Sequence, residues 1–135
     1  MSKIEKVFTY KGFECVILGQ ARGHRCGYVK IPDGHPLFQG SSLKKLNLLD
    51  QLRVHGGITY SEVSQYYSIE ADEIAWWIGF DCAHAFDGTD RALVEELNAT
   101  PELVFINDLP DSTVKDTAVV EAELPDLVDQ LEEMT

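Results

Sequence analysis

Three ionisable side chains and a cysteine follow directly on the most apolar run of this chain. Residues 74–80 include two adjacent tryptophans, and Asp81, Cys82, His84 and Asp87 come immediately after them. Burying carboxylates and an imidazole beside tryptophans is costly unless the polar groups are paired. The pattern therefore predicts a functional cluster at the end of a buried strand. A carboxylate beside an imidazole suits polar recognition or general acid–base catalysis.

The catalytic residues expected in this cluster are His84 and Asp81, together with His55. Either imidazole would serve as general base, and Asp81 would orient it. The alternative is a structural contact between His84 and Asp81. Asp81, His84 and Asp87 recur at every third position, which in a helical turn would suit Zn²⁺ or Mn²⁺. Because this spacing matches no strong metal-binding signature, we assign no metal ligand.

Two other polar loops could contribute to the same site. His55 precedes Gly56 and Gly57, where the backbone can come close to a ligand and its N–H groups can hold an anion. If the loops meet, they form a pocket for a small polar ligand with a ring, such as a nucleotide derivative. The alternatives are that His35 caps a loop, that the glycine pair forms a plain turn and that Trp77 belongs to the core. The ligand-binding residues expected on the pocket hypothesis are His35, His55, Gly56, Gly57, Thr59, Tyr60, Trp77, Asp81 and His84.

The elements that must position these residues are short strands and helices. Alternating apolar residues predict a hairpin over residues 6–20 with its turn at Lys11 and Gly12, and a third strand near residues 28–31. Residues 74–80 alternate as a strand packed on both faces. Residues 61–73 are expected to form a loop, and residues 103–106 an edge strand. Short helices are expected after Ser41 or Ser42 and after Asp90.

The last part of the chain has helical periodicity. Apolar residues recur at spacings of four and three from Val120 to Met134, so residues 109–135 are expected to form an acidic, amphipathic C-terminal helical segment. Pro125 should kink or break this helix near Leu124. The expected fold is a single α+β domain over residues 1–135, with a small, mostly antiparallel sheet and the C-terminal helix packed on one side.

Composition excludes some classes of partner. The net charge is −12, with a basic excess of five over residues 1–53 and acidic excesses of nine and eight over residues 54–107 and 108–135. Such a balance argues against binding a nucleic-acid backbone. No apolar run is long enough to cross a membrane. The three cysteines are widely spaced without a CxxC motif, which favours free thiols and a reducing cytoplasm. His24, beside Arg22 and Arg25, is expected on the surface, where this basic stretch could also meet an anionic ligand.

Three motifs in order resemble a family of small bacteriophage and prophage proteins. They are Gly34-His35-Pro36, then Val54-His55-Gly56-Gly57-Ile58-Thr59-Tyr60-Ser61, then Trp76-Trp77-Ile78-Gly79-Phe80-Asp81-Cys82-Ala83-His84. The resemblance implies a setting rather than a reaction. It suggests the host cytoplasm, where small phage proteins often act against host defence by binding or degrading nucleotide signals.

These observations lead to three hypotheses. The first is a phage-encoded counter-defence protein that sequesters a small nucleotide-like molecule. The second is a small hydrolase of a nucleotide derivative, metal-assisted or not. The third is an acidic inhibitor that binds a host protein through its C-terminal helix, and the same apolar stripe could instead form a homodimer. The sequence names no cofactor.

Overall fold

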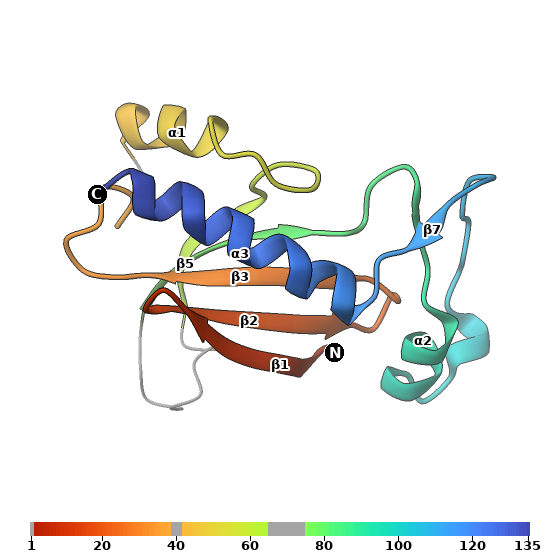
Figure 1. The fold of residues 1–135 in the computed structure, drawn as a ribbon. Helices are drawn as coiled ribbons and strands as arrows, with labels where there is room; N and C mark the ends of the chain where they lie inside the picture. The colour runs from red at the N-terminus through yellow and green to blue at the C-terminus, as the bar shows by residue number, and fades with distance from the viewer. Residues whose placement is uncertain (1, 39–41, 65–74) are drawn as a thin grey trace.

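The computed structural model describes residues 2–38, 42–64 and 75–135. Its main feature is a five-stranded sheet with strand order β1-β2-β3-β5-β4, in which every neighbouring pair is antiparallel (Figure 1). The mostly antiparallel α+β fold expected from the sequence is confirmed. The strands are β1 (Ser2–Tyr10), β2 (Phe13–Gln20), β3 (Arg25–Ile31), β4 (Tyr60–Ser64) and β5 (Ala75–Asp81).

The first two strands form the predicted hairpin. Lys11 and Gly12 both have positive φ, at 49° and 82°. Two consecutive residues of positive φ are typical of the type I′ turn, whose twist matches that of the flanking strands. The register of β1 shifts between Ile4 and Lys6, so Glu5 lies in a bulge of the edge strand. Bulges re-aim side chains, and this one is used by Arg25, as described below.

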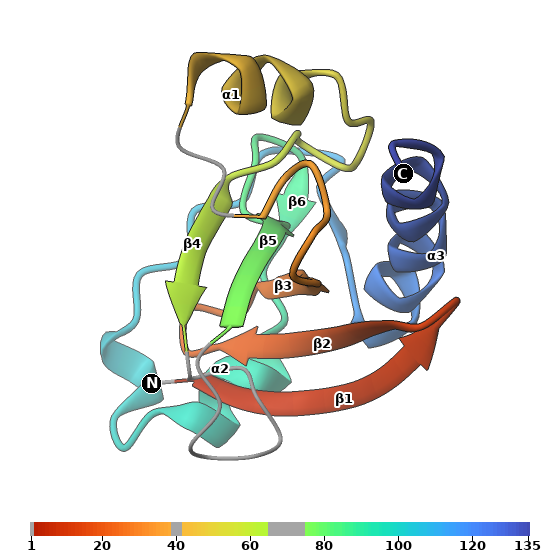
Figure 2. The same ribbon diagram turned by 90° about the vertical axis from the view of Figure 1, so that its left-hand side faces the viewer.

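Three helices accompany the sheet, and each begins at a capping side chain. They are α1 (Leu43–Asp50), α2 (Arg91–Leu97) and α3 (Thr117–Glu133). Ser42, Asp90 and Asp116 each accept hydrogen bonds from backbone N–H groups of the first turn. The predicted helices after Ser42 and Asp90 are thereby confirmed. In both ribbon views α1 and α2 lie at opposite ends of the molecule (Figures 1 and 2).

Both faces of the sheet are buried, as the alternation in β5 predicted. Ile78 and Phe80 point to one face, where they join residues of β2, β3 and α3 in the larger core. Trp77 points to the other face and packs in a smaller core with Val16 and Tyr28. Figure 2 shows α3 lying along one side of the sheet. The polar loops that continue β5 therefore start from a strand that is packed on both faces.

Pro125 does not break the C-terminal helix. The predicted break near Leu124 is wrong, because α3 continues from Thr117 to Glu133 with Pro125 inside it (Figure 1). The buried side chains of α3 lie on both sides of the proline, and all of them pack into the same core. We attribute the continuity to this packing, which outweighs the hydrogen bond that a proline cannot donate. The buried residues are Val120, Leu124, Leu127, Val128 and Leu131.

Arg25 is buried, whereas Arg22 in the same basic stretch is exposed. Its Nε donates to Glu5 Oε1 at 2.7 Å, and its Nη1 donates to Asp90 Oδ2 at 2.7 Å. Burial opposes the charged form, but the two carboxylates more than compensate, so the pKa of Arg25 lies above its ordinary value. The guanidinium joins the bulge of β1, the start of β3 and the cap of α2. This cross-link holds α2 against the sheet.

Two further expectations about loops are wrong. Residues 61–64 belong to β4 rather than to a loop, and they pair with β5; the rest of that predicted loop, up to residue 73, lies outside the described residues. Residues 103–106 form no edge strand, and a 3₁₀ turn, η1 (Pro101–Leu103), ends there. A two-residue strand, β6 (Asp87–Gly88), instead pairs in parallel with β7 (Thr113–Val114). The residue types at 103–106 suited a strand, but in the structure these residues follow the 3₁₀ turn and join no strand.

The cap of α3 allows a test of the fold. Replacing Asp116 by Ala removes the acceptor for the N–H of Val119, so we expect the free energy of unfolding to fall by about 1 kcal/mol. Asp126→Ala, an exposed position within the same helix, is the control and should cost nothing. Urea denaturation measures both. Equal stability of the two variants would contradict the role of the cap.

Candidate functional site

A buried carboxylate forms the centre of the polar cluster. The Asp87 side chain is 2% exposed. Both of its oxygens lie 2.9 Å from His55 Nε2. The backbone N–H of His84 donates to Oδ2 at 3.0 Å, and Lys115 Nζ lies 3.1 Å from Oδ1. Asp87 thus collects donors from three separate segments of the chain.

These donors determine the charge of Asp87. Burial by itself would raise the pKa of this carboxyl group. The hydrogen bonds from His55, from the backbone of His84 and from Lys115 outweigh burial and hold the pKa below its ordinary value. Asp87 is therefore a carboxylate at neutral pH, and it fixes the ring of His55 through Nε2.

His84 packs directly against the glycine turn of residues 55–57. A Cβ atom built on Gly56 would lie 1.9 Å from His84 Nε2, and Gly56 also has a φ of +70°. Both the backbone conformation and the space at this position require glycine. His84 Nε2 lies 3.3 Å from Asp81 Oδ1, and its ring centroid is 5.8 Å from that of His55. Two imidazoles, each beside a carboxylate, therefore face one another.

Helix α3 and the short strand β7 hold these loops in place. Glu123 accepts from the N–H of His55 at 2.8 Å, and Gln130 bonds both the N–H and the carbonyl of Arg53 at 2.7 Å. On the other side, Lys115 donates to the carbonyl of Thr113 at 2.9 Å. The His55 loop is thus fixed to α3, and the lysine is fixed to β7.

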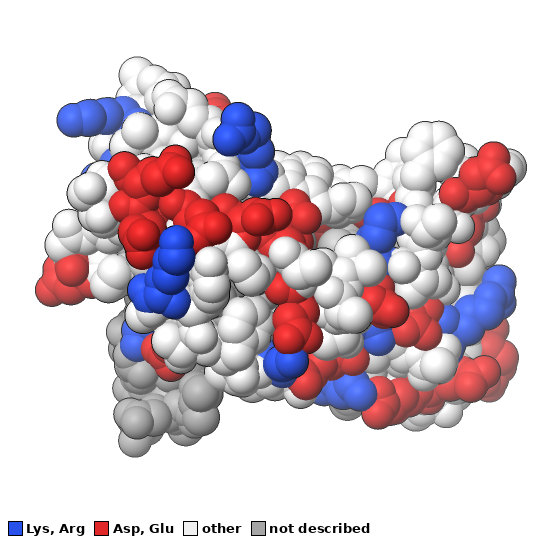
Figure 3. All heavy atoms as spheres, viewed as in Figure 1, with Lys and Arg blue, Asp and Glu red and all other residues white. Residues whose placement is uncertain are grey.

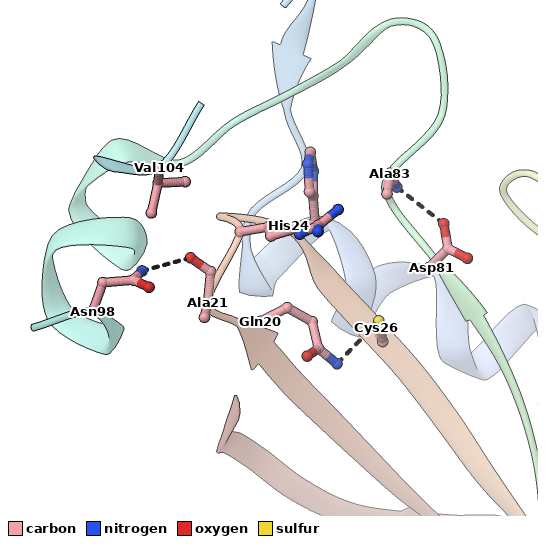
Figure 4. A pocket seen from close by; sticks show the side chains of 9 residues that line it. Gln20, Ala21, His24, Cys26, Asp81, Ala83, Asn98 and Val104 are labelled. Carbon is pink, nitrogen blue, oxygen red and sulfur yellow. Dashed lines mark hydrogen bonds between the residues drawn. The ribbon is translucent and has the colours of Figure 1, made fainter. Parts of the chain in front are cut away.

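Two adjoining cavities lie beside the cluster. The smaller, of about 180 Å³, is lined by His84 and Asp87 and by residues 107–109 and 112. The larger, of about 550 Å³, lies between the β2–β3 turn, the end of β5 and the C-terminal end of α2 (Figure 4). His24 and Ala83 line both cavities. Together they provide the volume of a small organic ligand.

Two buried polar atoms on the smaller cavity lack a partner. His24 Nδ1 and Ser112 Oγ are both shielded from solvent, and neither makes a hydrogen bond to any described residue. Both residues line the smaller cavity. Buried polar atoms are nearly always paired, and an unpaired one costs about 1–3 kcal/mol. A polar ligand that forms a hydrogen bond to either atom would therefore gain the most binding free energy there.

The structure brings together only part of the predicted site. His55, Gly56, Asp81 and His84 lie in one cluster, as the contacts above show. Gly57, with a φ of +81° and nothing within 4 Å of an added Cβ, continues the turn away from His84.

The other predicted residues lie elsewhere. Trp77 and Tyr60 pack at the smaller core, on the face of the sheet opposite α3. Thr59 is exposed, and its N–H donates to the carbonyl of Gly79. His35 is buried, with Nε2 2.8 Å from the Leu131 carbonyl and Nδ1 accepting from the N–H of Leu37. His35 therefore connects a loop to the last turns of α3.

Lys115 and Ser112 were not identified from the sequence, and the role of Asp87 was not identified either. Asp87 was named in the cluster without a role, whereas Asp81 was expected to orient whichever imidazole, His84 or His55, acts as the base. Lys115 and Ser112 lie in a segment with no motif. One weak signal existed for Lys115, since it is the sole basic residue of residues 108–135.

Cys15 and Cys82 add no nucleophile to the site. Burial raises the pKa of the Cys15 and Cys82 thiols to about 12 each, so neither is a thiolate at neutral pH. Cys82 is buried, as expected. Among the residues that the structure describes, no group of three or more His, Cys, Asp or Glu side chains could hold a metal ion.

Half of the acidic side chains of α3 form ion pairs with lysines of the first hairpin. Figure 3 shows acidic side chains gathered over α3 with basic side chains among them. Lys6 pairs with Glu121, and Lys11 lies 2.8 Å from Asp129 and 3.6 Å from Glu132. These ion pairs account for half of the six acids of α3, which weakens the hypothesis of an inhibitor that acts through this helix.

Comparison with protein-family models, with curated proteins and with solved structures finds no match to this chain. No helix within the described ranges has the length and hydrophobicity needed to span a membrane.

Proposed function

We propose that this protein binds a small polar ligand in the two adjoining cavities beside His84 and Asp87. The observation that carries the proposal is that two residues lining the smaller cavity, His24 and Ser112, each keep a buried polar atom, Nδ1 and Oγ, without a partner among the described residues. A ligand that offers hydrogen bonds to both atoms removes a cost that the free protein bears. The resemblance to small bacteriophage proteins makes a nucleotide signal of a host defence system the first ligand to test, with sequestration as the outcome.

Ser112→Ala tests this proposal. Because the hydroxyl has no partner in the free protein, its removal should leave the thermal midpoint of the free protein unchanged or raise it. If a ligand uses the hydroxyl, the same variant should bind about tenfold more weakly, as expected for one lost hydrogen bond. Ser2→Ala, at an exposed position of β1, is the control.

Native mass spectrometry of the protein purified from cells detects a ligand that stays bound and gives its mass. We expect a mass excess on the wild-type chain and on the Ser2 variant, and a smaller bound fraction on the Ser112 variant. A variant that is destabilised yet keeps the full bound fraction would contradict the proposal. If the ligand is lost during purification, the binding of a panel of nucleotides to the wild-type protein and to both variants is measured by calorimetry instead.

A specific observation also favours a second candidate, hydrolysis of a nucleotide derivative. Asp87 holds His55 through Nε2 while His84 faces the same ring at 5.8 Å. One imidazole can accept a proton from water while the other donates one to the leaving group. Turnover of a labelled nucleotide panel that is lost in both His55→Ala and His84→Ala would establish it. Absence of turnover by the wild-type protein at high concentration would leave sequestration.

A further inference from the structure

We propose that the larger cavity selects a planar ring that presents adjacent N–H donors, with guanine as the type, and that Asp81 is the acceptor. This inference rests on the proposed function, whose cavities it uses, and it names the chemical class of the ligand. Some hydrogen-bonding atoms of the cavity wall already have partners within the protein, and the inference is drawn from the atoms that do not.

Three of the four side-chain amide N–H groups of the wall are already used. Asn98 Nδ2 donates to the carbonyls of Ala21 and Val94, each at 2.8 Å. Gln20 Nε2 donates to Cys26 Sγ at 3.6 Å, as Figure 4 shows from close by. The side-chain oxygens of Asn98 and Gln20 have no partner among the described residues. Each amide therefore offers the cavity an acceptor.

Asp81 adds a charged acceptor at the opposite side of the cavity. Its Oδ1 accepts from the N–H of Ala83 at 3.1 Å and lies 3.3 Å from His84 Nε2. Its Oδ2 contacts no donor in the described ranges. In Figure 4 the carboxylate lies across the cavity from Asn98, with His24 between them. Asn98, Gln20 and Asp81 thus leave oxygens on the wall that can accept N–H groups from a ligand.

The charges of the wall favour a neutral donor over a compact cation. Arg22, also on the wall, is exposed and has no ion-pair partner among the described residues. A guanidinium repels an ammonium ligand but attracts a phosphate. A ring with N–H donors toward Asp81 and a phosphate toward Arg22 satisfies both groups. The remaining lining at Ala21, Cys26 and Val104 is apolar enough to receive the faces of a ring.

Guanine meets these requirements better than the other purines. Its N1–H and 2-amino group are adjacent donors, and Asp81 Oδ2 has the two lone pairs with which to accept both. Hypoxanthine lacks the amino group, and adenine presents an acceptor at N1. A site whose polar groups are built for one partner discriminates strongly against an analogue that leaves them unpaired.

The test is calorimetric titration of the full-length protein with the 5′-monophosphates of guanosine, inosine and adenosine. We expect the guanosine nucleotide to bind at least about tenfold more tightly than the inosine nucleotide and more tightly still than the adenosine nucleotide. Asp81→Asn should reduce the preference for guanosine over inosine to within about threefold. Asp33→Asn, an exposed change of the same chemistry, should keep it.

Failure of this inference is distinguishable from failure of the proposed function. Equal binding of the three nucleotides, or a co-purified ligand without N–H donors, overturns the inference and leaves a binding protein. An unchanged preference for guanosine in Asp81→Asn also overturns it.

Discussion

Replacing Asp87 by Asn should destabilise the protein by about 3 kcal/mol, the scale on which removing one partner of a buried ion pair acts. Asparagine has nearly the same shape, but its amide would place an N–H₂ group against Lys115 or His55, both of which donate. The donors of the cluster would then lose their common acceptor. Urea denaturation at neutral pH measures the loss. Asp126→Asn, on the exposed face of α3, is the control.

The same variant gives a prediction for pH. The pKa of Asp87 is lowered in the folded protein, so its contribution to stability is complete above the pKa of the unfolded state, about 4. The contribution is lost as the pH falls through the lower pKa of the folded state. The difference in stability between wild type and Asp87→Asn should therefore be constant near neutral pH and shrink below about pH 4. A difference that grows on acidification would contradict the ion pair.

Gly56→Ala should cost about 2 kcal/mol and displace His84 from the site. A left-handed conformation costs an ordinary residue about 1–2 kcal/mol. In addition, the new Cβ would lie 1.9 Å from His84 Nε2, so the imidazole would have to leave its position beside Asp81. Thermal unfolding and the NMR shifts of the His84 ring protons report the two effects.

Gly57 provides a matched control for this prediction. Its φ is +81°, but an added Cβ there meets nothing within 4 Å. Gly57→Ala should therefore carry the backbone strain alone and leave His84 in place. In a His84→Ala background, Gly56→Ala should cost no more than Gly57→Ala, since the clash is gone. Equal costs of the two glycine substitutions in the wild-type background would show that the contact with His84 is unimportant.

The strands and caps were predictable because their signals are local. Alternation identified β2, β3 and β5, the Lys11-Gly12 turn identified the hairpin, and Asp90 identified the start of α2. The predicted helix break at Pro125 was wrong because the effect of a proline depends on tertiary packing, which the buried residues on either side of it provide. The predicted edge strand over residues 103–106 was wrong for a similar reason, since β-type residues became a strand only where a partner strand was available.

The sequence predicted which kinds of side chain form the candidate site, but only some of the residues that belong to it. The spacing of Asp81 and His84 placed them on one loop, whereas the sequence left open whether His55 would join them. Three predicted residues lie elsewhere: Tyr60 and Trp77 point to the face of the sheet opposite α3, and the loop of His35 runs toward the last turns of α3. The residue types alone do not determine these directions. Lys115 and Ser112 come from a segment whose position depends on the short pairing of β6 with β7, which no periodicity reveals.

The position of α3 in the chain has a consequence for synthesis. All the strands precede α3, yet α3 supplies five fully buried side chains to the larger core. Until Leu131 has left the ribosome, Ile17, Val29 and Ile78 lack the buried side chains that α3 contributes to their core. Domains close when their last core element is available, so this sheet should complete folding only after translation of α3. Ribosome-bound chains that end before Thr117 should accordingly recruit chaperones, and chains extended beyond Thr135 by a linker should release them.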